Sequence, residues 1–101
     1  MKEIKFYYPY ISDKPKKKFF IYTNDGKKVY FGASGYEHFT NGHLNIKRRD
    51  AYLQRHQKKE NWNNPNSAGY WSARFLWLYP TYNEAYEIIK KELIKKNIYN
   101  I

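Results

Sequence analysis

The chain has 101 residues and contains no cysteine, which excludes disulfide bonds, thiol nucleophiles and zinc sites built from thiolates. It has no uninterrupted apolar run near the roughly 18 residues that a membrane-spanning helix needs. Its beginning also lacks the long apolar stretch and the small-residue cleavage site of a signal peptide. We therefore expect a protein that is not secreted and has no membrane partner.

Aliphatic side chains are scarce as well. Leu, Ile, Val and Phe together supply only 21 residues, a share near which many chains are disordered. Aromatic residues nevertheless make up 21% of the chain, and each of them buries a large apolar surface. A chain of this length suits one small domain. We predict a single domain over residues 1–101 with an aromatic-rich core.

Acidic residues are few: nine stand against 19 lysines and arginines, so the net charge is +10 and the pI is about 9.7. Fifteen of the cations are lysine, and Asn, Ile and Tyr are also frequent, as an AT-rich coding sequence would produce. Codon usage therefore accounts for part of the positive charge. The rest predicts an anionic partner.

The N-terminal part of the chain reads as β-structure. Pro9 cannot donate a hydrogen bond to a ladder, so residues 1–17 are predicted to hold an edge strand or an extended arm. Asp25 and Gly26 stand between two β-prone runs and predict a β-hairpin over residues 18–32, because tight turns need the positive φ that glycine tolerates.

Residues 46–96 form the predicted helical part. Helix formers and breakers place one helix over 46–59, a second over 68–78, and a third that begins at the capping pair Thr81 and Glu84. The predicted fold is α+β: a β-hairpin or small antiparallel sheet packed against three helices. Three tryptophans are expected to form much of the core, namely Trp62, Trp71 and Trp77.

The helix predicted over 46–59 carries most of its cations on one face. With 100° of rotation per residue, five of its six Lys and Arg side chains fall within about 120°. Such a face could contact phosphates, whose neutralisation releases condensed counterions, or could be only a solvated surface. A lysine cluster precedes the hairpin. The predicted phosphate-binding residues are Lys47, Arg48, Arg55, Lys58 and Lys59 of the helix, and Lys16, Lys17 and Lys18 of the cluster.

The opposite side of the same helix holds Ile46 and Leu53, so we expect that side to face the core. Arg49, His56 and Glu60 fall there too. They are candidates for a hydrolytic site, in which His56 acts as a general base, Glu60 orients it or binds a metal, and Arg49 holds a phosphate. The alternative is a buried polar network in which these side chains satisfy one another.

The segment after the hairpin contains two histidines, His38 and His43. In the absence of cysteine and of a nearby pair of carboxylates, they do not predict a metal site. Residues 32–36 lack the spacing and the lysine of a phosphate-binding loop. We predict no metal and no cofactor.

Glycine, aromatic and charged residues follow one another in a distinctive order between about residues 18 and 80: Phe31-Gly32-Ala33-Ser34-Gly35-Tyr36, Phe39-Thr40, His43, Arg48, Tyr52, Arg55-His56, Glu60-Asn61-Trp62, Pro65, Ala68-Gly69, Trp71-Ser72 and Leu76-Trp77. This order resembles a family of small, basic, uncharacterised proteins of large nucleocytoplasmic DNA viruses. The family pattern has His-Lys-Asp and Ser-Arg-Trp where this chain has His43-Leu44-Asn45 and Ser72-Ala73-Arg74. Without that aspartate, a shared metal or general-base site at the loop is weakened.

The resemblance implies a viral origin, a location in the virion or in the cytoplasm or nucleus of an infected cell, and a fold of one sheet plus helices. It implies no biochemical activity. The chemistry of the residues favours nucleic-acid binding through phosphates with little sequence preference, and DNA over RNA. Two alternatives stay open. The protein could be a small viral nuclease or nucleic-acid-processing enzyme, or it could be a structural component of the virion that binds acidic proteins and holds them together. Binding is favoured over catalysis.

Overall fold

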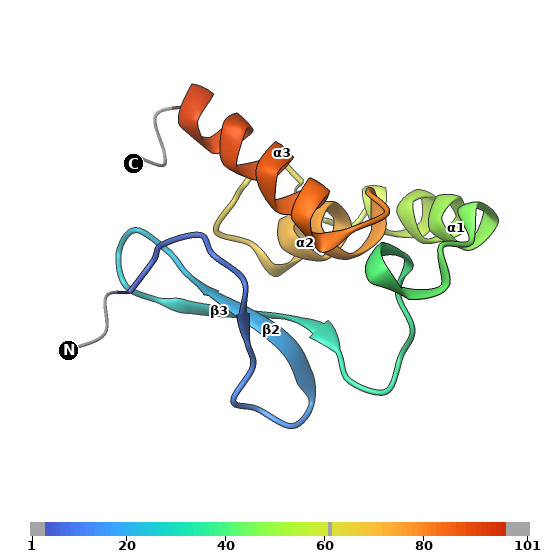
Figure 1. Cartoon of the computed structure of the whole chain (residues 1–101), viewed down its shortest axis with the longest axis horizontal. Coiled ribbons are helices and arrows are strands. Elements are labelled where there is room, and N and C mark those ends of the chain that lie inside the picture. The colour runs from blue at the N-terminus through green and yellow to red at the C-terminus, as the bar shows by residue number, and fades with distance from the viewer. Residues whose placement is uncertain (1–3, 61, 97–101) are drawn as a thin grey trace.

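The computed structural model describes residues 4–60 and 62–96. Its β part is a three-stranded antiparallel sheet in the order β1-β2-β3, and the helices lie together on one side of it (Figure 1). The strands are β1 (Tyr10–Ile11), β2 (Lys17–Tyr22) and β3 (Lys28–Ala33). The predicted α+β fold with a small antiparallel sheet is confirmed.

The hairpin of β2 and β3 extends one residue further at each end than the sequence predicted. Phe19 pairs with Phe31 across it, so aromatic rings face one another on the side that meets the helices. In the turn, the N–H of Thr23 donates to the carbonyl of Lys27 at 2.8 Å, and the N–H of Gly26 donates to the carbonyl of Thr23 at 2.9 Å. Gly26 has the positive φ expected of it, +84°.

β1 lies at the edge of the sheet, beside β2, so the predicted edge strand is confirmed over Tyr10–Ile11. Upstream of it, Tyr7 is buried and ties the N-terminal segment to the rest of the molecule. Its N–H donates to the carbonyl of Tyr22 at 2.8 Å, and its hydroxyl donates to Asn66 Oδ1 at 2.6 Å. Residues 1–3 of the predicted arm lie outside the described residues.

The three predicted helices are present. The second one changes from α-helical to π-helical hydrogen bonding part-way along, and a wide irregular turn precedes the first. These elements are η1 (Phe39–His43), α1 (Ile46–Gln57), α2 (Ala68–Trp71), η2 (Ser72–Trp77) and α3 (Tyr82–Lys95). None of the helices in the described part of the chain has both the length and the apolar character needed to cross a bilayer.

Local chemistry explains where the helices begin and end. Asn45, Ser67 and Thr81 cap α1, α2 and α3, each by accepting a hydrogen bond from a backbone N–H of the first turn. The predicted cap at Thr81 is confirmed. α1 ends two residues earlier than predicted, at Gln57, and beyond it the N–H groups of Lys59 and Glu60 share the carbonyl of His56. Residue 61 of the predicted helical part lies outside the described residues.

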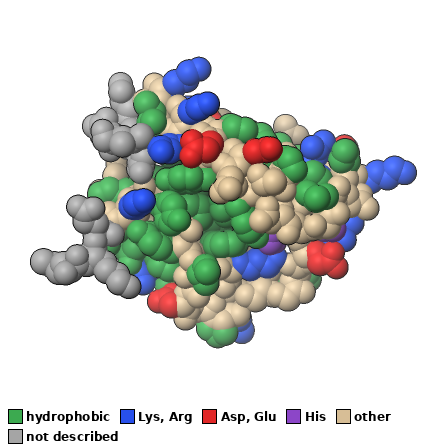
Figure 2. Space-filling model, in the orientation of Figure 1, with side chains coloured by type: hydrophobic (Ala, Val, Ile, Leu, Met, Phe, Trp, Pro, Cys, Tyr) green, Lys and Arg blue, Asp and Glu red, His purple; other side chains and the backbone are tan. Residues whose placement is uncertain are grey.

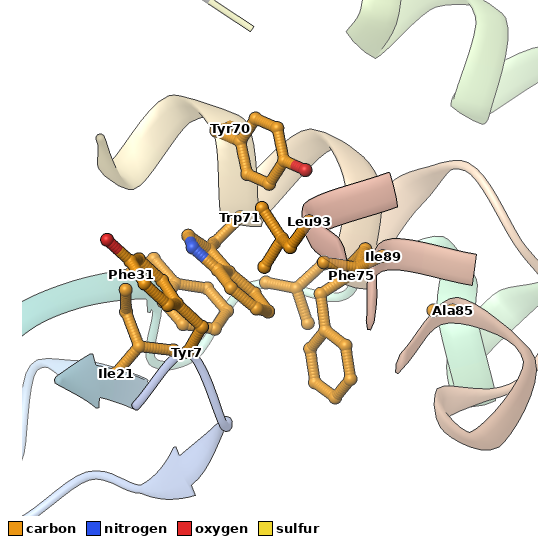
Figure 3. Packing of buried hydrophobic residues seen from close by; sticks show 10 residues of the cluster. Tyr7, Ile21, Phe31, Tyr70, Trp71, Phe75, Ala85, Ile89 and Leu93 are labelled. Atoms are coloured by element: carbon orange, nitrogen blue, oxygen red, sulfur yellow. The ribbon is translucent and has the colours of Figure 1, made fainter. Parts of the chain in front are cut away.

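Trp71 lies in the middle of an aromatic core between the sheet, η2 and α3 (Figure 3). It is fully buried, and its Nε1–H donates to the carbonyl of Pro65 at 2.8 Å. Its ring packs against the rings of Phe31 and Phe75. The cluster of buried residues consists of Tyr7, Ile21, Phe31, Tyr70, Trp71, Phe75, Leu76, Ala85, Ile89 and Leu93.

The expectation that all three tryptophans form the core is wrong for Trp62. Its indole N–H donates to Glu60 Oε1 at 3.1 Å in the polar segment after α1, and it is only partly buried. Trp77 packs against the edge of the core. The expected core-facing side of α1 is also a wrong prediction: no residue of α1 is buried, and Ile46 is 58% exposed. α1 packs against η1 and η2, outside the main core.

Candidate anion-binding cleft

An open cleft of about 700 Å³ separates α1 from the sheet. One wall is formed by β3 and the loop that follows it, the other by α1, and α2 and η2 contribute the floor. Gly32 of β3 allows these walls to meet at the floor. A Cβ atom at this position would lie 2.9 Å from Leu76 Cδ1 and 3.2 Å from Lys18 Cβ, so a larger residue would displace the Leu76 side chain. The φ of Gly32, +79°, is also strained for any residue with a Cβ.

A stack of three rings forms the α1 wall of the cleft. The ring of Tyr52 lies parallel to the indole of Trp77, with centroids 4.1 Å apart, and the imidazole of His56 covers its other face at 4.1 Å. Burial raises the pKa of Tyr52 to about 12, with a further contribution from the carboxylate of Glu60. The Tyr52 phenol therefore stays neutral, and the stack sets the rotation of α1 about its own axis.

This rotation brings two of the predicted phosphate-binding residues into the cleft. Arg48 and Arg55 lie on the same side of α1 as Tyr52, at spacings of three and four residues, and both line the cleft. Lys17 of β2 lines it from the opposite side. The sequence separates Lys17 from Arg48 by a whole hairpin and a loop, and the structure places both around one cavity.

Four of the other predicted phosphate-binding residues do not line the cleft. Lys47, Lys58 and Lys59 are exposed on or just after α1, and Lys16 is exposed before β2. Figure 2 shows that one face of the molecule has hydrophobic side chains gathered in its middle, with most Lys and Arg side chains towards its edges. The positive charge is thus partly concentrated in the cleft and partly dispersed.

Lys18 differs from the lysines beside it, because its side chain is half-buried and already bonded. Its Nζ donates to the carbonyl of Tyr36 and lies 2.8 Å from Nδ1 of His38, so it ties β2 to the loop after β3. Burial lowers the pKa of Lys18. Lys18 shapes the wall of the cleft and is a poorer candidate for a phosphate contact than Lys17.

The two histidines of the loop are held by protein groups. His38 Nε2 lies 2.8 Å from the hydroxyl of Tyr82, and burial, helped by the charge of Lys18, lowers the pKa of His38 to about 4. His43 Nδ1 accepts a hydrogen bond from the N–H of Asn45 at 2.9 Å. Among residues 4–60 and 62–96, no group of three or more His, Cys, Asp or Glu side chains is arranged to hold a metal ion.

The structure assembles only part of the predicted hydrolytic site. His56 Nδ1 lies 3.2 Å from Glu60 Oε2, and both residues line the cleft. Arg49 is placed elsewhere: its Nε bonds to Asp50 at 3.1 Å, and its guanidinium lies 5.4 Å from the centroid of the Phe39 ring. The structure therefore brings His56 and Glu60 together but not Arg49, which stands two helical turns before His56, about 10 Å away along the axis, and contacts Phe39 of η1.

Two residues of the cleft were missed by the sequence reading. Glu37 forms an ion pair with Arg48 at 3.2 Å between Oε2 and Nη1, and Tyr36 lines the mouth of the cleft with its side chain 74% exposed. Nothing in the local sequence marks Glu37, which stands in an irregular loop. The one sequence signal for Tyr36 is an aromatic residue directly after Gly35 in a glycine-rich loop. Its exposure is seen only in the structure.

Residues 10–56, a little less than half of the chain, match the model of a family described as "Family of unknown function (DUF5754)". The matched segment spans the sheet, η1 and nearly all of α1, and so includes both cationic walls of the cleft. Searches of curated proteins and of solved structures found no match. The family description names neither an activity nor a viral source, so the viral resemblance stays a prediction.

Proposed function

We propose that this protein binds nucleic acid through phosphate contacts, with little sequence preference, and that the cleft is where it does so. The observation that carries the proposal is the convergence of Lys17 from β2 with Arg48 and Arg55 from α1 around one open cavity. Cations brought together from distant segments form a local field that attracts a polyanion, whereas cations spread over a surface do not.

The charge balance of the cleft supports this proposal. Its two carboxylates already have partners, because Glu37 pairs with Arg48 and Glu60 accepts from both His56 and Trp62. By contrast, Lys17 and Arg55 form no ion pair with any other described residue. Two cations in the cleft therefore remain available to an anion from outside.

Guanidinium groups suit this task because they donate two parallel hydrogen bonds to one phosphate. Such contacts recognise the backbone of a nucleic acid and carry no base information, which fits binding with little sequence preference. We propose DNA, ahead of RNA, as the nucleic acid that is bound. The peripheral cations Lys47, Lys58 and Lys59 would extend the footprint along the backbone beyond the cleft.

The test compares two double variants that remove equal charge. In Lys17→Gln with Arg55→Gln, both cations leave the cleft; in Lys91→Gln with Lys95→Gln, two exposed cations leave α3. Binding is measured by fluorescence anisotropy of a labelled oligonucleotide over a series of salt concentrations. We expect the cleft variant to bind at least about tenfold more weakly, with a log–log salt slope smaller by about 1.4 for a single strand.

The α3 variant should show a much smaller loss in the same assay. Equal losses in the two variants would mean that only net charge matters and that the cleft is not the binding site. The charge-reversal variant Lys58→Glu with Lys59→Glu then tests whether nucleic-acid contacts extend beyond the cleft, since these two residues are exposed but do not line it.

A further inference from the structure

Tyr36 is the most exposed aromatic side chain in the described part of the chain. Its side chain is 74% exposed, against 42% for Phe6, the next most exposed aromatic residue. Within that same part of the chain, its ring packs against no other aromatic ring and has no cation over its face. In a protein whose aromatic residues are mostly packed together, this ring is largely exposed to solvent.

The backbone that carries Tyr36 is nonetheless anchored. Its carbonyl accepts a hydrogen bond from Lys18 Nζ, and two residues later His38 is held between Lys18 and Tyr82. An aromatic ring presented from an anchored backbone loses less conformational entropy on binding a planar partner than a ring on a free loop does.

The ring stands at a cleft that already supplies cations. Tyr36, Lys17 and Arg55 all line the same cavity, whose volume of about 700 Å³ is within the range of sites that enclose a small organic ligand. Two other tyrosines line the cleft. Tyr52 cannot stack on a ligand, because Trp77 and His56 cover its two faces. Tyr30 packs against Phe20 and has Lys14 Nζ 4.3 Å from its ring centroid. Among the described tyrosines of the cleft, Tyr36 is therefore the one whose ring has neither an aromatic nor a cationic neighbour.

We infer that the cleft takes one unpaired nucleotide, with its base stacked on Tyr36 and its phosphate at Lys17 and Arg55, so that the protein binds single-stranded nucleic acid in preference to a duplex. This inference rests on the proposed function. A base in a duplex has both faces covered by its neighbours, and exposing one requires unstacking that costs a few kcal/mol. A single strand offers the base freely.

The experiment uses variants of Tyr36 that leave the charge of the protein unchanged. Tyr36→Leu removes the ring and Tyr36→Phe keeps it, while Phe6→Leu removes an exposed ring outside the cleft as a matched control. Each protein is titrated, by fluorescence anisotropy, into a labelled oligodeoxythymidylate of about 12 nucleotides and into a hairpin duplex with the same number of phosphates.

We expect the wild-type protein to bind the single strand more tightly than the duplex. Tyr36→Leu should weaken single-strand binding about tenfold without changing its salt slope or the affinity for the duplex. Tyr36→Phe and Phe6→Leu should bind like the wild type. Circular dichroism of each variant confirms that the fold is kept.

The outcomes separate this inference from the function on which it rests. If the Lys17 and Arg55 variant weakens binding but Tyr36→Leu does not, or if the wild type binds both probes equally, phosphate binding stands and the inference is overturned. If the wild type binds neither probe, both are overturned. Loss of single-strand affinity in Tyr36→Leu but not in Phe6→Leu, at an unchanged salt slope and together with the loss in the Lys17 and Arg55 variant, supports both.

Discussion

The Nδ1 atom of His38 lies 2.8 Å from the Nζ of Lys18, close enough for the ammonium to donate a hydrogen bond to the ring. Since Nδ1 accepts, the proton of the neutral ring sits on Nε2, which donates to the hydroxyl of Tyr82, also at 2.8 Å. One imidazole thus joins β2, the loop after β3 and the start of α3 beside the cleft. Each of these three elements contributes one side chain to the junction.

This junction predicts a pH dependence of stability. The pKa of His38 falls from 6.5 to about 4 on folding, first because of burial and then because of Lys18 and the more distant His43. The unfolded chain therefore takes up a proton that the folded chain does not accept. The resulting stabilisation is fully present above pH 6.5 and is lost as the pH falls from 6.5 to about 4.

Urea unfolding at several pH values between 7.5 and 4 measures this effect. We expect His38→Gln, which does not titrate but still forms hydrogen bonds, to lose less stability over this interval than the wild type does. Phe6→Leu, which changes no titratable group, is the control and should follow the wild type. Equal pH slopes for His38→Gln and wild type would contradict the assignment.

The three consecutive lysines Lys16, Lys17 and Lys18 should differ in what they contribute: Lys18 to stability, Lys17 to binding, and Lys16 to neither. Lys18→Met keeps the aliphatic stem but removes the bonds to Tyr36 and His38, so we expect the free energy of unfolding to fall by about 1–3 kcal/mol. Lys16→Met removes an exposed charge and should change it by less than about 0.5 kcal/mol. Chemical denaturation measures both values. Lys17→Met should leave the free energy of unfolding unchanged and weaken the binding of the oligonucleotide.

A further prediction concerns the ion pair between η2 and α3. Arg74 Nη1 lies 2.8 Å from Glu92 Oε2, and both side chains are about one-quarter exposed or less. Glu92→Gln leaves the guanidinium half-buried without its counter-charge, so we expect a loss of about 1–3 kcal/mol. The exposed pair of Lys28 and Asp13, at 3.5 Å, is the comparison.

Asp13→Asn should lower stability far less than Glu92→Gln does, because water screens that exposed pair. Thermal denaturation at low and at moderate salt distinguishes the two variants. A loss in Asp13→Asn as large as that in Glu92→Gln would show that burial does not decide the strength of these pairs.

Replacing Trp71 in the core and Trp77 at the cleft should have different effects on stability. Trp71→Phe opens a void in the core and leaves the carbonyl of Pro65 without its donor, so we expect a loss of about 1–3 kcal/mol. Trp77→Phe should cost less, because Trp77 is only partly buried and phenylalanine can still stack on Tyr52. Measured unfolding free energies in the reverse order would contradict the described core.

If the cleft binds an oligonucleotide, tryptophan fluorescence reports it. Trp77 lines the cleft and Trp71 does not. Fluorescence quenching on titration should therefore persist in Trp71→Phe and diminish in Trp77→Phe.

Much of the fold could be predicted because its causes lie within a few residues. Asp25 and Gly26 predicted the hairpin through backbone geometry, and Thr81 predicted the start of α3 through one hydrogen bond. Such signals depend on residues nearby in the chain, so they do not require knowledge of the tertiary contacts around them. The candidate site was predicted less well, because the orientation of α1 depends on the stacking of Tyr52 on Trp77, two residues 25 positions apart.

The separation of Arg49 from His56 has another origin. A helical wheel places both residues on one face, but they stand two turns apart, about 10 Å along the axis, so different groups hold them: Asp50 and Phe39 hold Arg49, while Glu60 and Tyr52 hold His56. Similarly, Lys17 and Lys18 are neighbours with the same side chain. Only the position of His38 in space makes one of them a structural residue and leaves the other open to solvent.

The sequence by itself determined the composition of this protein: its positive charge, its aromatic core, its lack of thiol chemistry, and the turns and caps that mark its elements. The tertiary structure alone decided which cations meet around the cleft and which aromatic ring stays uncovered beside them. The physical reason is the distance along the chain over which each kind of interaction acts. Turns and caps are set by hydrogen bonds within a few residues, whereas the grouping of charges and rings depends on packing between segments that the chain keeps far apart.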